Sequence, residues 1–253
     1  GRDLQLDYAT DLPIVDGQAD VAAFRQRLND PDRRMMGAEQ ETWLAGELAS
    51  SVESGRKWQV LGNAVVMARV MMPAARKTMG DEAFAQAIAS LPPGIGVLVE
   101  RWERLAALGL PYGLDIWDGY PVARERLYDA IAAANARVVV VSGDSHAFWA
   151  NELYDDDAQL RAVEFGTTGI TSPGAGDYLT GVEVGELFAA ASKEVVFSEQ
   201  AAKGFILLTL TPEAVKSELM TVSTIVAKDY EIAIRKTFTV TAQESGVSPL
   251  KAI

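Results

Sequence analysis

The sequence predicts an α/β or α+β fold in which helices cover a β-sheet. Runs of apolar, β-branched residues typical of buried strands alternate with segments whose apolar residues recur at helical spacing. The composition, 49% hydrophobic and 23% charged, is typical of a globular protein, and 253 residues are enough to bury a sizeable core. This length allows one large domain or two small ones, and no internal repeat or low-complexity tract is evident.

The first half of the chain predicts mainly helices. Asp20 is placed to cap a short helix over residues 20–29, and apolar spacing predicts a second helix over 37–50. The run KWQVLGNAVVM, residues 57–67, predicts a buried strand that ends in a loop. The stretch 114–121 is rich in turn formers and aromatic residues and predicts a loop. Further helices are expected near residues 81–90, 94–107 and 122–135.

The second half of the chain predicts mainly strands. They are expected over residues 137–141, 160–169, 204–211, 216–224 and 236–242. The strands over 204–211 and 216–224 would form a hairpin. A loop rich in Gly, Pro and Ser over 169–180 precedes a helix expected over 184–192.

Charge and residue usage exclude several classes of function. Lys and Arg number 23 against 35 Asp and Glu, a net charge of −12, so neither a nucleic-acid-binding surface nor an anionic-membrane anchor is expected. The chain has no Cys, which excludes disulfides, thiolate catalysis and Cys-ligated metal sites within it. His146 is the single histidine, so a mechanism that needs two imidazoles cannot be housed in this chain alone. No apolar run is long enough for a transmembrane segment.

The sequence SGDSH, residues 142–146, directly follows the strand expected over 137–141. Loops at the carboxyl ends of strands in covered sheets are favoured places for function, and Gly143 would let the backbone turn sharply. Asp144 and His146 offer a hard oxygen and a borderline nitrogen, which suit different metal ions. The alternative is that Asp144 caps a turn and His146 is an ordinary hydrogen-bonded histidine.

Two acidic residues, Asp115 and Asp118, lie three positions apart in the expected loop over 114–121. Taken alone, Asp118 before Gly119 indicates a plain turn. In combination with the loop at 142–146 and the acidic chain, both carboxylates become candidate cation ligands. Asn63 follows the part of the expected strand over residues 58–61, and it could contact a metal or a phosphoryl oxygen, or only turn the chain.

Two other interpretations of the polar residues remain open. A phosphate could be clamped by arginines, although arginines on a helix surface are usually solvated. The candidates are Arg33, Arg34, Arg124 and Arg126. A serine hydrolase would use Ser142 or Ser145 with His146 as base. Neither serine lies in a G-x-S-x-G motif, and neighbouring side chains point apart on a strand.

Five segments of the chain, in this order, carry a family resemblance. They are RRMMGAEQETWLAGELASS (33–51), KWQVLGNAVVMA (57–68), DIWDGYPVARERL (115–127), VVVVSGDSHAFWANEL (138–153) and VEFGTTGITSPG (163–174). Together they resemble the phosphodiesterase/alkaline phosphatase D (PhoD-like) family of metallophosphoesterases. The resemblance covers about residues 30–175, and W-D-G-Y-P-x-x-R and G-D-x-H are its most specific parts.

The resemblance implies a fold and an activity. The fold is an αββα sandwich, two mixed β-sheets flanked by helices, with a metal cluster at the strand ends. The activity is hydrolysis of phosphate monoesters and diesters by a metal-activated water, at alkaline pH in many members. Ca²⁺ and Fe³⁺ are the implied metals, with Zn²⁺ or Mn²⁺ as other possibilities, and a periplasmic or secreted location is typical.

The resemblance also implies site residues. Asp144 replaces the first His of the related G-H-x-H motif and would bind a hard cation such as Ca²⁺, while His146 would bind the transition metal. Asp118 is the first choice and Asp115 the second for the carboxylate from the W-D-G-Y loop. The broader superfamily has a His where this chain has Asn63. The residues expected to contact substrate are Asn63, Tyr120 and Arg124.

The family's earlier motifs, which supply two aspartates and an Asn, are not found in this sequence. Residues 1–253 are therefore expected to be the carboxyl-terminal portion of a single catalytic domain, with a missing amino-terminal segment of the same protein as partner. On this basis the isolated chain is expected to be inactive and the parent protein active. The alternative from another class is a noncatalytic binding domain that retains the scaffold.

Overall fold

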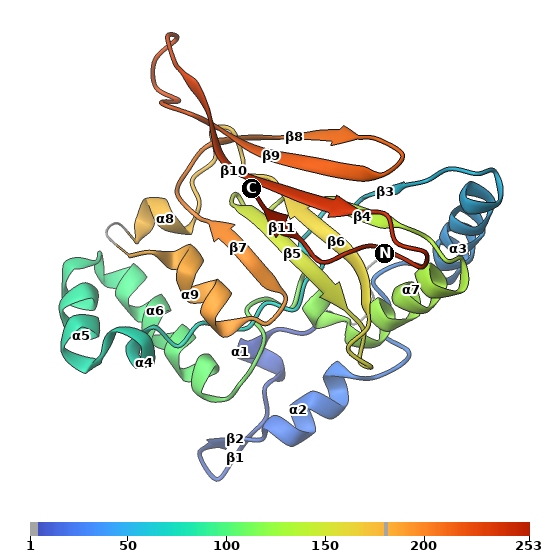
Figure 1. Cartoon of the computed structure of the whole chain (residues 1–253). Coiled ribbons are helices and arrows are strands. Elements are labelled where there is room, and N and C mark those ends of the chain that lie inside the picture. The colour runs from blue at the N-terminus through green and yellow to red at the C-terminus, as the bar shows by residue number, and fades with distance from the viewer. Residues whose placement is uncertain (1–4, 180–181) are drawn as a thin grey trace.

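Two β-sheets packed face to face form the centre of the protein (Figure 1). The computed structural model describes residues 5–179 and 182–253. The first sheet has the order β3 (Gln59–Gly62), β4 (Val138–Ser142), β6 (Leu160–Gly166), β5 (Phe148–Tyr154) and β7 (Val195–Glu199). The second has the order β11 (Lys251–Ala252), β10 (Ile232–Thr241), β9 (Ala214–Val222) and β8 (Gly204–Leu210).

The first sheet is mixed and the second is antiparallel. β4 runs parallel to both β3 and β6, whereas β5 runs antiparallel to β6 and β7. β8, β9 and β10 form an antiparallel meander, which confirms the expected hairpin near residue 212. The expected mixed α/β class is confirmed, with two packed sheets and with helices against the first of them.

Both faces of β4 are buried, which explains its unbroken run of valines. Val139 packs toward the second sheet, in one core with Phe165 and Phe238, whose ring centroids are 6.5 Å apart. Val138 and Val140 belong to the other core, between the first sheet and the helices. Side chains therefore alternate between an inter-sheet core and a helix-side core.

Helices cover the face of the first sheet that points away from the second (Figure 1). They include α3 (Ala38–Glu53), α7 (Pro121–Ala133), α8 (Ala175–Tyr178) and α9 (Val184–Ala191). A separate group consists of α4 (Ala75–Met79), α5 (Asp81–Ser90) and α6 (Pro93–Ala107). The first residues described form α1 (Tyr8–Asp11), the hairpin β1 (Ile14–Val15) and β2 (Gln18–Ala19), and α2 (Val21–Leu28). Asp20 caps α2 as expected, because its carboxylate accepts the N–H of Ala23 at 2.9 Å.

Part of the secondary structure differs from the expectation. The strand expected over residues 57–67 ends at Gly62. Five strands among the described residues were not expected: the longer β5 and β7, and the two-residue strands β1, β2 and β11. β5 has the sequence FWANELY, and Asn151 within it is fully buried where it donates to Glu164 at 2.8 Å. A buried polar residue on a strand breaks the apolar pattern by which strands are found. In the described part of the chain, no helix is both long and apolar enough to cross a membrane.

After β3 the chain runs through the interior without joining a sheet, and side chains satisfy its backbone. Five consecutive N–H groups donate to side-chain oxygens. The pairs are Met67 to Glu164 (2.7 Å), Ala68 to Glu164 (3.0 Å), Arg69 to Glu194 (2.6 Å), Val70 to Asp118 (2.7 Å) and Met71 to Ser192 (2.9 Å). Burial raises the pKa of Glu164, against the opposing effect of the groups that donate to it. These acidic side chains hold a buried irregular segment in place.

Candidate functional site

The loop that follows β4 has an unusual backbone. Asp144 and His146 both adopt the left-handed conformation, with φ of 65° and 56°. Such a conformation costs a residue other than glycine about 1–3 kcal/mol and clusters at functional sites. Gly143, which was expected to let the backbone turn sharply, is not left-handed, and the left-handed residues of this loop are Asp144 and His146.

Hydrogen bonds fix the His146 ring and its protonated nitrogen. Nδ1 lies 2.9 Å from the carbonyl oxygen of Pro173. A carbonyl oxygen only accepts, so Nδ1 carries the hydrogen and Nε2 of the neutral ring keeps its lone pair. The hydroxyl of Thr168 donates to the His146 carbonyl at 3.0 Å, which holds the backbone of the loop. This is the arrangement typical of a metal-binding histidine.

Asp144 and Asp115 line one cavity of about 260 Å³, although they belong to different loops. Both side chains are exposed. The remaining lining residues are Val66, Val70, Tyr112, Ile116, Gly143, Ser145, Trp149, Ala175 and Gln200. The structure therefore brings the two acidic loops to one cavity, with Asp115 as the carboxylate that lines it together with Asp144.

Asp118 lies in the short 3₁₀ helix η1 (Trp117–Gly119) and occupies a different place. Its carboxylate is buried, with Oδ1 2.7 Å from the Arg124 guanidinium and Oδ2 2.7 Å from the Val70 N–H. Burial raises the pKa of Asp118, and the positive charge of Arg124 opposes this effect. Asp118 is not among the described residues that line the Asp144 cavity. The first choice of loop carboxylate thus has both oxygens engaged within the protein.

Arg124 also differs from its expected surroundings. Its side chain is 3% exposed, and besides Asp118 it donates to the carbonyl of Met67 at 3.2 Å. It is neither a solvated surface charge nor open to a substrate in this arrangement. Arg124 and Asp118 instead form an ion pair that ties α7 to the buried segment after β3.

Asn63 and Tyr120, both expected to contact substrate, make contacts within the scaffold. Asn63 donates to the carbonyl of Val65 at 2.5 Å and accepts the indole N–H of Trp117 at 3.2 Å. Tyr120 is buried, and the guanidinium of Arg33 lies 4.7 Å from the centre of its ring. Both residues join the loop over 114–121 to neighbouring elements.

Three aromatic or polar residues that line the cavity, Tyr112, Trp149 and Gln200, were not singled out from the sequence. Tyr112 lies next to Asp115 in the cavity, and burial together with the charge of Asp115 raises the pKa of its phenol. Gln200 comes from the end of β7, and Trp149 donates its indole N–H to the Ser145 hydroxyl at 2.8 Å. No local motif marks these residues, because they reach the cavity through the folding of distant segments.

We expect Gly119→Ala to lower the free energy of unfolding by about 1–3 kcal/mol or more. A Cβ at Gly119 would lie 1.8 Å from the carbonyl oxygen of Leu114, so the loop that carries Asp115 and Asp118 would have to shift. Urea unfolding followed by circular dichroism measures the change. Gly143→Ala is the matched control, because a Cβ there meets no atom within 4 Å. Equal losses for the two variants would contradict this account.

Comparisons with known proteins agree with the fold and the motifs. Alkaline phosphatase D of Bacillus subtilis (strain 168) is 26% identical over 223 residues, which are 86% of this chain and 32% of that protein. The chain thus spans about a third of the length of this curated relative. A solved structure described as "Structure of PhoD" has the same fold, with a TM-score of 0.62 and 23% identity over 88% of this chain and 36% of that one. The model of the PhoD-like phosphatase family matches residues 6–219, so the chain belongs to the PhoD-like phosphatase family.

Proposed function

We propose that the protein hydrolyses phosphate monoesters or diesters with bound metal ions, at the cavity between the loops that carry Asp115 and Asp144. Membership of a phosphatase family supports the general class of reaction. The observation that carries the proposal is the loop after β4, which presents Asp144 from a left-handed backbone at the cavity that Asp115 also lines. His146 belongs to the same loop and is also left-handed, although it is not among the described residues that line this cavity.

The donor atoms in the chain fit part of a mixed-metal site. Exposed carboxylates at Asp144 and Asp115 suit a hard cation such as Ca²⁺, and the free Nε2 of His146 suits Fe³⁺, Zn²⁺ or Mn²⁺. Among the described residues, no three His, Asp or Glu side chains gather closely enough to hold an ion. We therefore propose that an upstream segment of the same protein supplies further ligands. Export of that protein stays a prediction.

The residues of the chain divide into ligands and residues that position them. Bound metal ions would supply an activated water for attack on phosphorus and offset the charge of the phosphoryl oxygens. The Pro173 carbonyl holds His146 with Nε2 as the available nitrogen. Asp118 pairs with Arg124 and accepts the N–H of Val70. Through these contacts the two residues hold the loop that carries Asp115 at the cavity. In this proposal Asp118 is a positioning residue.

A chelation experiment tests the proposed function. The full-length protein should hydrolyse 4-nitrophenyl phosphate, lose that activity after chelation, and regain it when Ca²⁺ and Fe³⁺ are returned. Elemental analysis should find the metals in the purified protein. Turnover that survives full metal removal would contradict the proposal, and a protein with neither turnover nor metal would favour the noncatalytic scaffold.

Labelling with a fluorophosphonate tests the alternative that the protein is a serine esterase that uses Ser142 or Ser145. We expect none, because Ser142 is buried and the Ser145 hydroxyl already accepts a hydrogen bond from Trp149. If a serine is labelled and its modification abolishes turnover, the protein is a serine esterase and the metal mechanism is wrong.

A further inference from the structure

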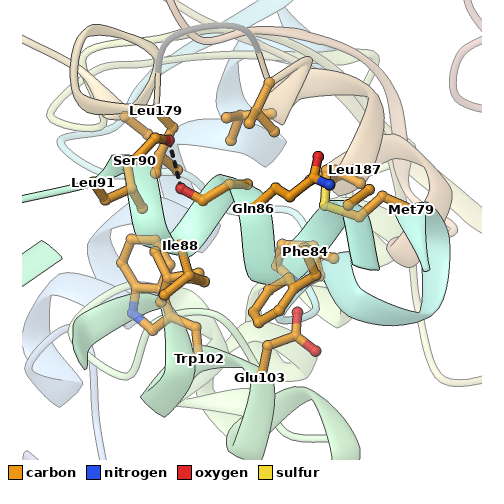
Figure 2. A pocket seen from close by; sticks show the side chains of 18 of the residues that line it. Met79, Phe84, Gln86, Ile88, Ser90, Leu91, Trp102, Glu103, Leu179 and Leu187 are labelled. Atoms are coloured by element: carbon orange, nitrogen blue, oxygen red, sulfur yellow. Dashed lines mark hydrogen bonds between the residues drawn. The ribbon is translucent and has the colours of Figure 1, made fainter. Parts of the chain in front are cut away.

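A second cavity, of about 420 Å³, lies between the helical group α4–α6 and the pair α8 and α9. Its walls are mainly apolar, with Phe84 and Ile88 from α5, Trp102 from α6, and Leu179 and Leu187 across the space (Figure 2). This volume lies within the range of small-molecule sites, which are concave and mostly apolar.

The polar side chains in this cavity are few. Ser90 donates to the carbonyl of Ala87 at 2.7 Å, and Glu103 accepts the N–H of Arg76 at 3.0 Å. No Lys or Arg is found among its described lining residues, and the carboxylate of Glu103 repels a phosphate group. The chemistry of this space fits an uncharged, apolar group.

The apolar cavity adjoins the Asp144 cavity. Tyr112 and Ala175 line both of them. The Tyr112 ring lies 6.2 Å from Trp102 on one side and 4.8 Å from Phe188 on the other, and Phe188 lies 5.3 Å from Trp149. An aromatic wall thus runs from the apolar cavity to Trp149, which lines the Asp144 cavity.

We infer that the apolar cavity binds an alkyl or aryl group esterified to the phosphate of the substrate. This inference rests on the proposed function, because it places the phosphate at Asp144 and the apolar group beyond Tyr112. Hydrolysis of esters with a large apolar group is then favoured over hydrolysis of small polar esters. The added binding comes from removing the alkyl or aryl carbons from water.

Calorimetric titration of the full-length, metal-loaded protein with n-octylphosphonate and methylphosphonate tests this inference. The carbon–phosphorus bond of these probes resists hydrolysis, so binding is measured without turnover. We expect octylphosphonate to bind at least about 10-fold more tightly, since each buried methylene contributes up to about 0.8 kcal/mol and 1.4 kcal/mol is a factor of ten.

Ala87→Phe, which fills the cavity from α5, should remove the octyl advantage and leave methylphosphonate binding unchanged. Ala85→Phe is the matched control on the same helix, because Ala85 is exposed and does not line the cavity. Leu187→Trp, from the facing helix α9, provides a second filling variant if Ala87→Phe fails to fold. An octyl advantage that is absent in the parent, or that survives in a folded filling variant, overturns the inference.

Hydrolysis of 4-nitrophenyl phosphate separates this inference from the proposed function. Turnover without any octyl advantage overturns the apolar site and leaves the function standing. An octyl advantage that Ala87→Phe removes, in a protein without metal-dependent turnover, supports the apolar site and overturns the function.

Discussion

Asp144→Asn and His146→Asn are each expected to reduce phosphate-ester hydrolysis by roughly 100-fold or more. Residues that only orient metal ligands typically contribute 10–100-fold, and a direct ligand contributes at least as much. Asn suits both positions because it tolerates the left-handed backbone that Asp144 and His146 adopt. The variants therefore test the donor atoms without adding backbone strain. Rates with 4-nitrophenyl phosphate and metal content per protein molecule, both on the full-length protein, are the measurements.

Asp157→Asn is the matched control for Asp144→Asn. Asp157 is an exposed acid in the turn between β5 and β6, so the same change in charge is made away from the cavity. Its rate and metal content should equal those of the parent protein. The assignment of Asp144 and His146 fails if both variants keep parental rates in buffer free of chelators.

The sequence predicted those elements whose local residue pattern indicates only one kind of secondary structure. The valine run of β4 and the helical spacing of α3 and α7 are set by residues close together in the chain, so their positions agree with expectation. β5 was missed because its buried Asn151 is satisfied by Glu164, thirteen residues away and on another strand. The stretch after β3 was taken for a strand because its apolar residues are buried, although its N–H groups bind side chains instead of a neighbouring strand.

The candidate site shows the same division. The motif G-D-x-H located the loop of Asp144 and His146, but the bond from His146 to Pro173 joins residues 27 positions apart, and no local pattern reveals it. The choice between Asp115 and Asp118 depends on Arg124 and Val70, which engage one of these acids and leave the other at the cavity. Spacing in the sequence carries no information about which acid is buried.

Asp118→Ala is expected to lower the free energy of unfolding by about 3–5 kcal/mol, because removal of one partner leaves the other charge of a buried ion pair uncompensated. The two side chains are 3–4% exposed and 2.7 Å apart, so water cannot replace the lost carboxylate. The Val70 N–H would also lose its acceptor. Urea unfolding of the metal-free protein measures the effect independently of any bound ion.

Asp115→Ala separates a structural role from a metal-binding role. Asp115 is exposed at the cavity, so its loss should change the stability of the metal-free protein by no more than about 0.5 kcal/mol, while metal content falls. Asp118→Leu combined with Arg124→Met should recover part of the stability lost in Asp118→Ala, because apolar side chains can replace a buried ion pair. If Asp118 is instead a metal ligand, its removal will lower metal content and leave the metal-free protein as stable as the parent. In that case Asp118 would be the metal ligand and Asp115 would not, which is the reverse of the assignment that the structure favours.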